Sequence, residues 1–265
     1  MAANAADGAS AAYAAHRTAC AAKGGTSAEW ASAGLDAALD AVLDATFDAE
    51  MWSSYACALA SFVLVCVACF VAEKLPIRRA QPWRLNGGRL TNAEWFAAAR
   101  VAAANALVAH LPVNVLAFWY YRHVSGHGTS LAPATVAAEL CFCAAFVEVW
   151  FYATHRALHT PWLYARVHKV HHRFAYPSAV CGLYAHWLEF ALANQLGVVG
   201  GPVLVGCHPV TTRVWLSLAL ANVALSHAGF GFGDHDAHHE TFQSNYGVFG
   251  ACDRLFGTLR RVESL

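Results

Sequence analysis

The sequence HRALHTPWLYARVHKVHH, residues 155–172, contains five histidines and determines how the rest of the chain is interpreted. Its histidines are spaced HxxxH and then HxxHH, and a second HxxHH lies further along the chain. Residues three and four apart share one face of a helix, so each motif is expected to direct its imidazoles towards one place. Eight imidazoles exceed the three or four protein ligands of one zinc site, and imidazole is a good ligand for iron. The pattern therefore predicts a site for two metal ions, held by His155, His159, His168, His171, His172, His235, His238 and His239.

The composition indicates that this site belongs to a membrane protein. Of the 265 residues, 58% are hydrophobic and 13% are charged, whereas about 25% are charged in a typical soluble domain. Lys plus Arg and Asp plus Glu number 17 each, so no excess charge favours nucleic acid as a partner. Residues 52–72 are uncharged, which is long enough to cross a hydrocarbon core of about 30 Å. Further apolar stretches cover residues 95–119, 134–154, 181–205 and 210–230.

These patterns predict an all-α, multi-pass membrane protein with four to five transmembrane helices and a cytosolic, histidine-rich di-metal cap. Residues 1–50 are expected to form an alanine-rich tail with an acidic amphipathic segment, and residues 51–265 the membrane domain. Residues 73–93 and 155–180 are richer in Lys and Arg than the links at 121–132 and 206–213. Because basic loops stay in the cytosol, both histidine clusters are expected on the cytosolic side.

The motifs between hydrophobic hairpins resemble the fatty acid hydroxylase superfamily of membrane di-iron oxygenases. The resemblance covers residues 52–261 and is strongest over residues 148–261. Outside the histidine motifs the resemblance to the family extends to PWLY at 161–164, NYG at 245–247 and DRLFGT at 253–258. The stretch AHWLE at 185–189, with residues 200–203 and 206–208 after it, is similar to the sterol C4-methyl oxidase branch.

The resemblance implies O2-dependent oxidation of a lipid C–H bond at two iron ions, most specifically hydroxylation of a sterol C4-methyl group. Electrons would come from NAD(P)H through a partner, for which the family suggests cytochrome b5 and its reductase. An endoplasmic reticulum membrane is favoured over a plastid membrane. The alternatives are a hydroxylase or desaturase of another lipid (fatty acyl, sphingolipid or C5-sterol), and a non-oxidative or inactive metal-binding paralogue.

Two further histidines and three carboxylates complete the expected site. By the family pattern His186 and His227 would join the ligands, although their spacing alone leaves a structural role equally open. Glu148, Glu189 and Asp236 are expected to orient ligands or to balance the charge of the metal ions, with a structural role as the alternative for Glu148 and Glu189, since a carboxylate at membrane depth must be paired. Only seven residues separate His227 from His235, fewer than the family has there, so we expect metal binding to be kept and sterol specificity to be loosened.

Overall fold

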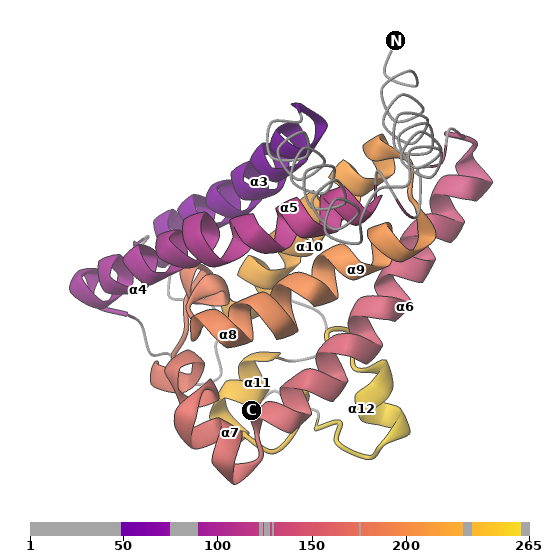
Figure 1. The fold of residues 1–265 in the computed structure, drawn as a ribbon. Coiled ribbons are helices and arrows are strands. Elements are labelled where there is room, and N and C mark those ends of the chain that lie inside the picture. Colours follow the sequence, from indigo (N-terminus) through magenta and orange to yellow (C-terminus); the bar gives the residue numbers. More distant parts are fainter. Residues whose placement is uncertain are drawn as a thin grey trace, which may run out of the picture.

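The computed structural model describes residues 49–74, 90–121, 124, 128, 130–174, 176–229 and 235–260. These residues form helices joined by short loops and contain no strand, which confirms the all-α prediction (Figure 1). The predicted tail and amphipathic segment before residue 49 lie outside the described residues, as does most of the link between His227 and His235.

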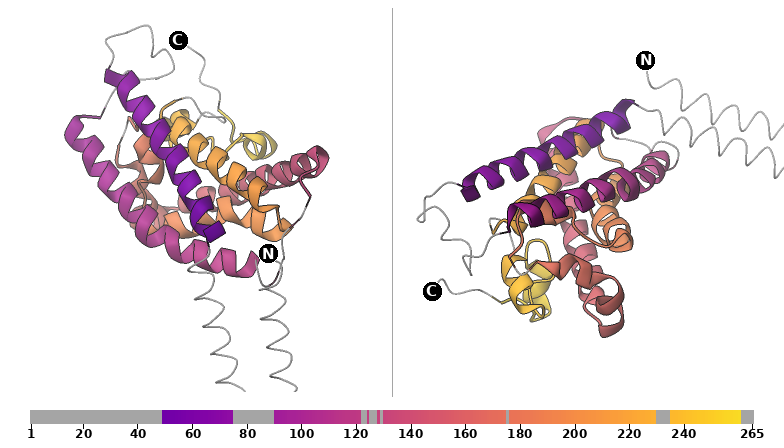
Figure 2. Two further views of the ribbon diagram at one scale, coloured as in Figure 1. Left: turned by 90° about the horizontal axis from the view of Figure 1, so that it is seen from above. Right: turned by 90° about the vertical axis from the view of Figure 1, so that its left-hand side faces the viewer.

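Among the residues that the structure describes, four helical stretches are long and apolar enough to cross a membrane, which agrees with the predicted four to five. They are Ala49–Glu73, Asn92–Tyr120, Pro133–Leu158 and Trp187–Val205. The stretch predicted at residues 210–230 is the helix α10 (Pro209–His227), which packs along α3 (Ala49–Lys74) in the same bundle. Figure 2 shows these helices from two further directions, with α3 and α10 side by side.

The second stretch is one continuous helix with an irregular turn in its middle. It consists of α4 (Asn92–Ala104), the π-helical turn η2 (Asn105–Ala109) and α5 (His110–Tyr120). Thr91 and Glu94 start it with a capping box, in which each side chain bonds the backbone of the other residue. Pro112 lies just beyond the π-helical turn and has no amide to donate, so the chain adjusts its hydrogen bonding at this point.

The fourth stretch begins later than residue 181, where its apolar run starts. Residues Ala179–Leu183 form a separate, buried 3₁₀ helix, η5. The membrane stretch follows as α8 (Trp187–Glu189), the π-helical η6 (Phe190–Gln195) and α9 (Leu196–Val205), and ends at Gly206 in a left-handed conformation with φ 64°. A Cβ atom at Gly201 would lie 2.9 Å from the Cα atom of Cys143, so glycine allows α9 to approach α6 closely.

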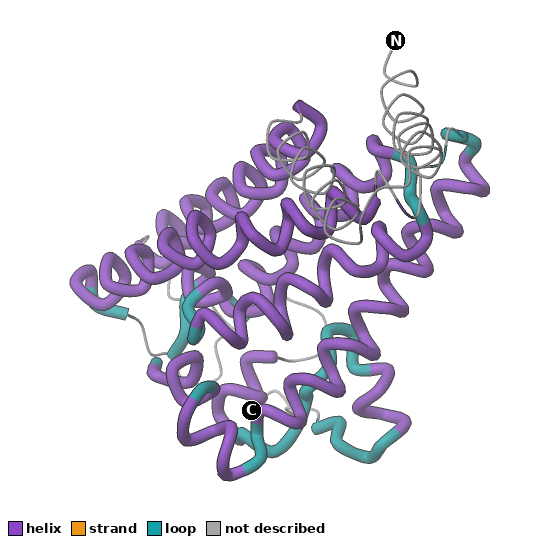
Figure 3. The backbone as a smooth tube through the Cα atoms, in the orientation of Figure 1, coloured by secondary structure: helices purple, strands orange, loops and turns teal. Residues whose placement is uncertain are grey.

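Helix α6 (Pro133–Leu158) connects the bundle to a cap at one end of the molecule (Figure 1). The cap consists of short helices and loops, and Figure 3 shows its loops gathered at that end. Its helices are α7 (Pro161–Arg166), η4 (His168–Arg173), α11 (His235–Thr241) and α12 (Ala251–Leu255). The three histidine motifs therefore meet where α6 leaves the apolar bundle.

Candidate metal centre

Nine of the ten predicted histidines converge in two adjacent groups. In each group, one nitrogen from every ring lies within 4.8 Å of the corresponding nitrogens of the others. The five-histidine group is His155, His159, His168, His172 and His238. The four-histidine group is His171, His227, His235 and His239.

The motifs do not correspond to one group each, contrary to the sequence-based expectation. In each motif the two histidines four residues apart join the same group: His155 with His159, His168 with His172, and His235 with His239. The middle histidine of each HxxHH, His171 or His238, joins the other group. The two groups are therefore interleaved, and each HxxHH segment contributes to both.

Four Nε2 atoms of the five-histidine group form a closed ring. The successive distances are 2.9 Å from His159 to His168, 3.0 Å from His168 to His172, 3.2 Å from His172 to His238 and 3.1 Å from His238 to His159. A square with edges of this length has its centre about 2.2 Å from each corner, close to the zinc–imidazole distance of about 2.0–2.1 Å. His155 contributes a fifth Nε2 atom, which is buried and has no hydrogen-bond partner.

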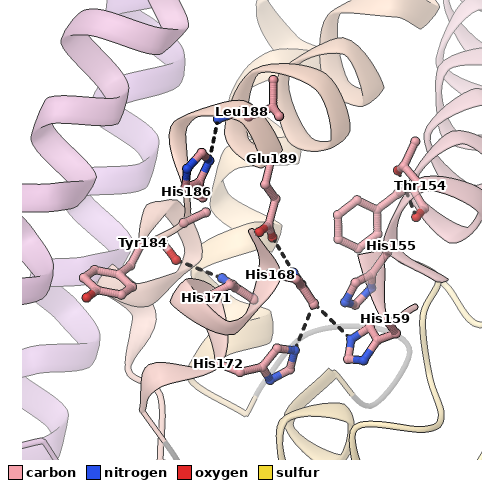
Figure 4. Close-up of polar contacts among 12 residues, drawn as sticks. Thr154, His155, His159, His168, His171, His172, Tyr184, His186, Leu188 and Glu189 are labelled. Carbon is pink, nitrogen blue, oxygen red and sulfur yellow. Dashed lines mark hydrogen bonds and ion pairs between the residues drawn. The ribbon is translucent and has the colours of Figure 1, made fainter. Parts of the chain in front are cut away.

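The other ring nitrogen of several ligands identifies the tautomer. Nδ1 of His155 donates to the carbonyl of Tyr246 at 2.9 Å, and Nδ1 of His238 donates to that of Ser244 at 2.6 Å. Nδ1 of His168 donates to Oε1 of Glu189 at 2.8 Å (Figure 4). Because these oxygens only accept, each Nδ1 carries the proton and each Nε2 presents a lone pair. The lone pairs of His168 and His238 face the Nε2 atoms of His159 and His172 at 2.9–3.2 Å, an arrangement that can hold a cation.

The four-histidine group shows the same arrangement with fewer close contacts. Nδ1 of His171 donates to the carbonyl of Tyr184 at 2.9 Å, and Nδ1 of His227 to that of Val223 at 2.8 Å. Their Nε2 atoms, both with lone pairs, lie 3.2 Å apart. Nε2 of His235 and both ring nitrogens of His239 are buried without hydrogen-bond partners. This donor set also suits a metal ion.

Burial keeps the cap histidines neutral, as metal binding requires. Desolvation lowers the pKa of His159 and that of His168 to about 3, and the nearby imidazoles of His168 and His171 add to the effect at His159. The pKa values of His235 and His239 are lowered in the same direction, mainly by burial and then by neighbouring imidazoles. A neutral imidazole has a lone pair for a metal ion, whereas an imidazolium has none.

The carboxylates have different roles. Glu189 is buried, and its Oε1 accepts from Nδ1 of His168 at 2.8 Å. Glu148 contacts backbone instead of imidazole: its oxygens accept from the amides of Val248, Phe249 and Cys252 at 2.7–2.8 Å. It thereby fixes the segment whose Tyr246 carbonyl holds His155. The side chain of Asp236 lies outside the described part of the structure.

Asp253, which lies in the DRLFGT stretch, completes this support, although its role was not predicted. Its carboxylate accepts from the amides of Tyr246 at 2.9 Å and Gly247 at 2.7 Å and from the hydroxyl of Thr258 at 2.7 Å. The sequence contained the signal in the NYG and DRLFGT stretches, but no spacing rule indicates that they bind each other.

The structure does not bring His186 to either group. This residue precedes α8, where its Nδ1 accepts a hydrogen bond from the amide of Leu188 at 3.2 Å and so caps the helix. Figure 4 shows it turned away from the other histidines. Its position corresponds to the structural role that the spacing left open.

A largely apolar cavity of about 390 Å³ adjoins both groups. His155 and His168 of one group and His171, His227 and His235 of the other line it. From there it extends along α10 as far as Trp215, which at 1.5 Å per residue is a span of about 18 Å. The cavity can accept a long apolar molecule with one end at the imidazoles.

Comparison with known proteins agrees with this geometry. The Fatty acid hydroxylase family model matches residues 140–258. Fatty acid hydroxylase domain-containing protein 2 of Homo sapiens is 41% identical over 126 residues, which is 45% of this chain and 38% of the relative. Very-long-chain aldehyde decarbonylase GL1-8 of Oryza sativa subsp. indica is 31% identical over 169 residues, 56% of this chain and 63% of the relative.

Methylsterol monooxygenase 2-2 of Arabidopsis thaliana is 30% identical over 179 residues, 59% of this chain and 67% of the relative. The chain thus matches only 38% of the length of the human relative and about two thirds of the plant relatives. No solved structure matches the chain. With its helical membrane bundle, its two interleaved histidine groups and these matches, the chain belongs to the fatty acid hydroxylase superfamily.

Proposed function

We propose that this protein is a membrane oxidoreductase that oxidises a C–H bond of a lipid with O2 at two histidine-bound iron ions. The observation that carries the proposal is the apolar cavity, which ends at five imidazoles drawn from both groups. When bound, the iron ions supply the activation of O2 that an unactivated C–H bond requires. One oxygen atom enters the C–H bond and the other leaves as water, with two electrons and two protons supplied from outside.

The residues of the chain orient the metal ligands, exclude water and bind the substrate. Backbone carbonyls and Glu189 fix the tautomers and orientations of the imidazoles, so that the lone pairs converge before any ion arrives. Burial of both groups keeps bulk water away from the reacting carbon. The apolar wall along α10 binds the hydrocarbon part of the substrate.

As substrate we propose a 4-methylsterol, hydroxylated at its C4-methyl group. The support is the match to methylsterol monooxygenase 2-2 over 67% of that relative and a cavity whose length and volume suit a sterol. The second candidate is a long-chain aldehyde or another fatty substrate. It is favoured by the match to aldehyde decarbonylase GL1-8 and by the same elongated cavity, which an extended chain would also fill.

The remaining parts of the proposal concern location and electron supply. We place the protein in the endoplasmic reticulum membrane with its cap in the cytosol, on the basis of the positive charge near the histidine clusters. The described chain offers no strand-based dinucleotide-binding unit. Electrons would therefore reach the cap from NAD(P)H through a partner such as cytochrome b5 and its reductase.

The test is turnover by the purified protein in lipid nanodiscs, supplied with O2, NADPH, cytochrome b5 and its reductase. Iron per chain is measured first, and then 4-methylsterol and a long-chain aldehyde are offered in parallel, with products identified by mass spectrometry. We expect about two irons per chain, given two groups of ligands, and a hydroxymethyl sterol. Turnover of the aldehyde alone would favour the second candidate substrate. A purified protein without iron would overturn both candidate functions.

A further inference from the structure

The apolar cavity contains a small set of polar side chains that the metal ligands do not explain. Besides the histidines and Glu189, the described lining has three side-chain amides and one hydroxyl: Asn194, Gln195, Asn222 and Ser226. Asn194 and Gln195 are the last two residues of η6, whereas Asn222 and Ser226 lie one turn apart on α10. The amides therefore reach the cavity from two different helices.

Gln195 is buried, with 2% of its surface exposed, and its amide nitrogen has no hydrogen-bond partner. Its side chain also interacts with the imidazole of His110. The Nε2 donor remains available, and leaving a buried donor unpaired is unfavourable in a folded protein.

Asn194 and Asn222 are half-buried, and neither side chain makes a hydrogen bond within the described part of the chain. By contrast, the indole nitrogen of Trp215, which also lines the cavity, donates to the carbonyl of Val198 at 2.8 Å. Polar groups at membrane depth are expensive unless paired, so amides that line a cavity without protein partners indicate a ligand that pairs them.

We propose that Gln195 and Asn222 form a polar subsite that binds a hydroxyl or carbonyl oxygen of the lipid substrate. The inference rests on the proposed lipid-oxidising function and adds a determinant of specificity to it. Asn222 precedes the ligand His227 by five residues, about 7.5 Å along α10. An oxygen held at this distance fixes how far the hydrocarbon extends towards the imidazoles, and hence which carbon lies there.

The main test is Asn222→Leu, which removes the amide at nearly constant volume. Equilibrium binding to the full chain in nanodiscs is measured for two pairs of radiolabelled lipids: a 4-methylsterol with its 3-deoxy analogue, and hexadecanol with hexadecane. We expect the variant to bind the oxygenated lipid about tenfold more weakly, as the loss of one hydrogen bond predicts, and the oxygen-free lipid as the wild type does. Leu218→Met, at an apolar position of the same lining, should change neither.

Gln195→Glu is the second variant, because it keeps an oxygen for His110 and removes the amide donor. It too should weaken binding only of the oxygenated lipid, with iron per chain unchanged. Equal losses for both members of a pair, no loss at all, or a wild type that does not prefer the oxygenated members would overturn the subsite. If the effect appears with hexadecanol and the sterol does not bind, the subsite stands and the proposed sterol substrate fails.

Discussion

The two histidine groups differ in how completely the protein arranges them without an ion. In the five-histidine group, four Nε2 atoms form a closed ring with edges of 2.9–3.2 Å. In the four-histidine group, only His171 and His227 are in close contact, at 3.2 Å, and His239 has two unpaired ring nitrogens. One group is thus preorganised, whereas the other needs an ion to draw its ligands together.

The two groups also differ in what holds the outer nitrogens of their rings. In the five-histidine group, Glu189 holds His168, and the segment supported by Glu148 and Asp253 holds His155, although Nδ1 of His172 is buried without a partner. In the four-histidine group, backbone carbonyls hold His171 and His227, whereas both ring nitrogens of His239 are buried without partners in the described structure. Ligands that are oriented in advance lose less conformational freedom on binding, so we expect the five-histidine group to bind its ion more tightly.

The largest expected difference is between two single variants at neighbouring positions, His171→Ala and His172→Ala. These positions are adjacent, yet they belong to different groups. His171→Ala leaves the ring intact and should keep about one iron per chain, whereas His172→Ala opens the ring and should keep close to none after chelator treatment. Both should lose turnover. Equal iron contents, measured by mass spectrometry of the metal, would contradict the ranking of the groups.

Glu148→Ala should reduce stability next most strongly. It removes the acceptor of three backbone amides and leaves them buried, which we expect to cost about 3 kcal/mol or more. Because the loosened segment carries Tyr246, the five-histidine group should also lose its higher affinity for the metal ion. Denaturant unfolding in detergent and iron retention measure the two effects, and Glu94→Ala, at an exposed helix start, is the control. An unchanged free energy of unfolding would show that the contacts of Glu148 with these amides do not stabilise the protein.

Glu189→Gln is expected to act more mildly and on one ion. The amide can still accept from Nδ1 of His168 but carries no charge, and loss of such a partner weakens metal affinity about 10–100-fold. A chelator titration should therefore shift for the more tightly bound ion and leave the other unchanged. A shift of both ions by the same amount would mean that Glu189 acts on the whole cap.

Acid should give the most gradual effect. In the metal-free protein the pKa values of His159 and His168 are lowered to about 3, against about 6.5 in an unfolded chain. A lowered folded pKa means that the unfolded state binds more protons, so stability is full above pH 6.5 and falls as the pH drops from 6.5 towards 3. Unfolding of the metal-free protein against pH measures this. A flat profile over that range would contradict the neutral, buried state of these rings.

The sequence was sufficient for the fold class and for most of the site, because both depend on local patterns. Apolar runs predicted the membrane helices, and histidine spacing predicted the residues that converge. The assignment of ligands to groups was not predicted. The first HxxHH lies on a 3₁₀ helix and the second on the α-helix α11, yet both send their middle histidine to the other group. Spacing along the chain therefore does not decide which group a histidine joins.

The supporting contacts were beyond prediction for another reason. Most of them are backbone carbonyls, such as those of Tyr184, Val223 and Ser244, and a carbonyl is present in every residue. Glu148 was expected near imidazole because it lies two helical turns before His155, but its carboxylate is occupied by amides a hundred residues further along the chain. His186 had no spacing partner, and family resemblance alone had suggested it as a ligand.

The brace between Glu148 and the segment around Tyr246 also determines when, during biosynthesis, the metal can enter. The ribosome releases His155 and His159 early, together with the helix that carries them, but Nδ1 of His155 meets its carbonyl 91 residues later. The ring lacks its fourth nitrogen until His238 has been made, and Glu148 has no amides to bind until residues 248–252 follow. A metal ion bound by this group can therefore be held in full only after residue 252 has been made, so metal binding is a late step in the folding of the cap.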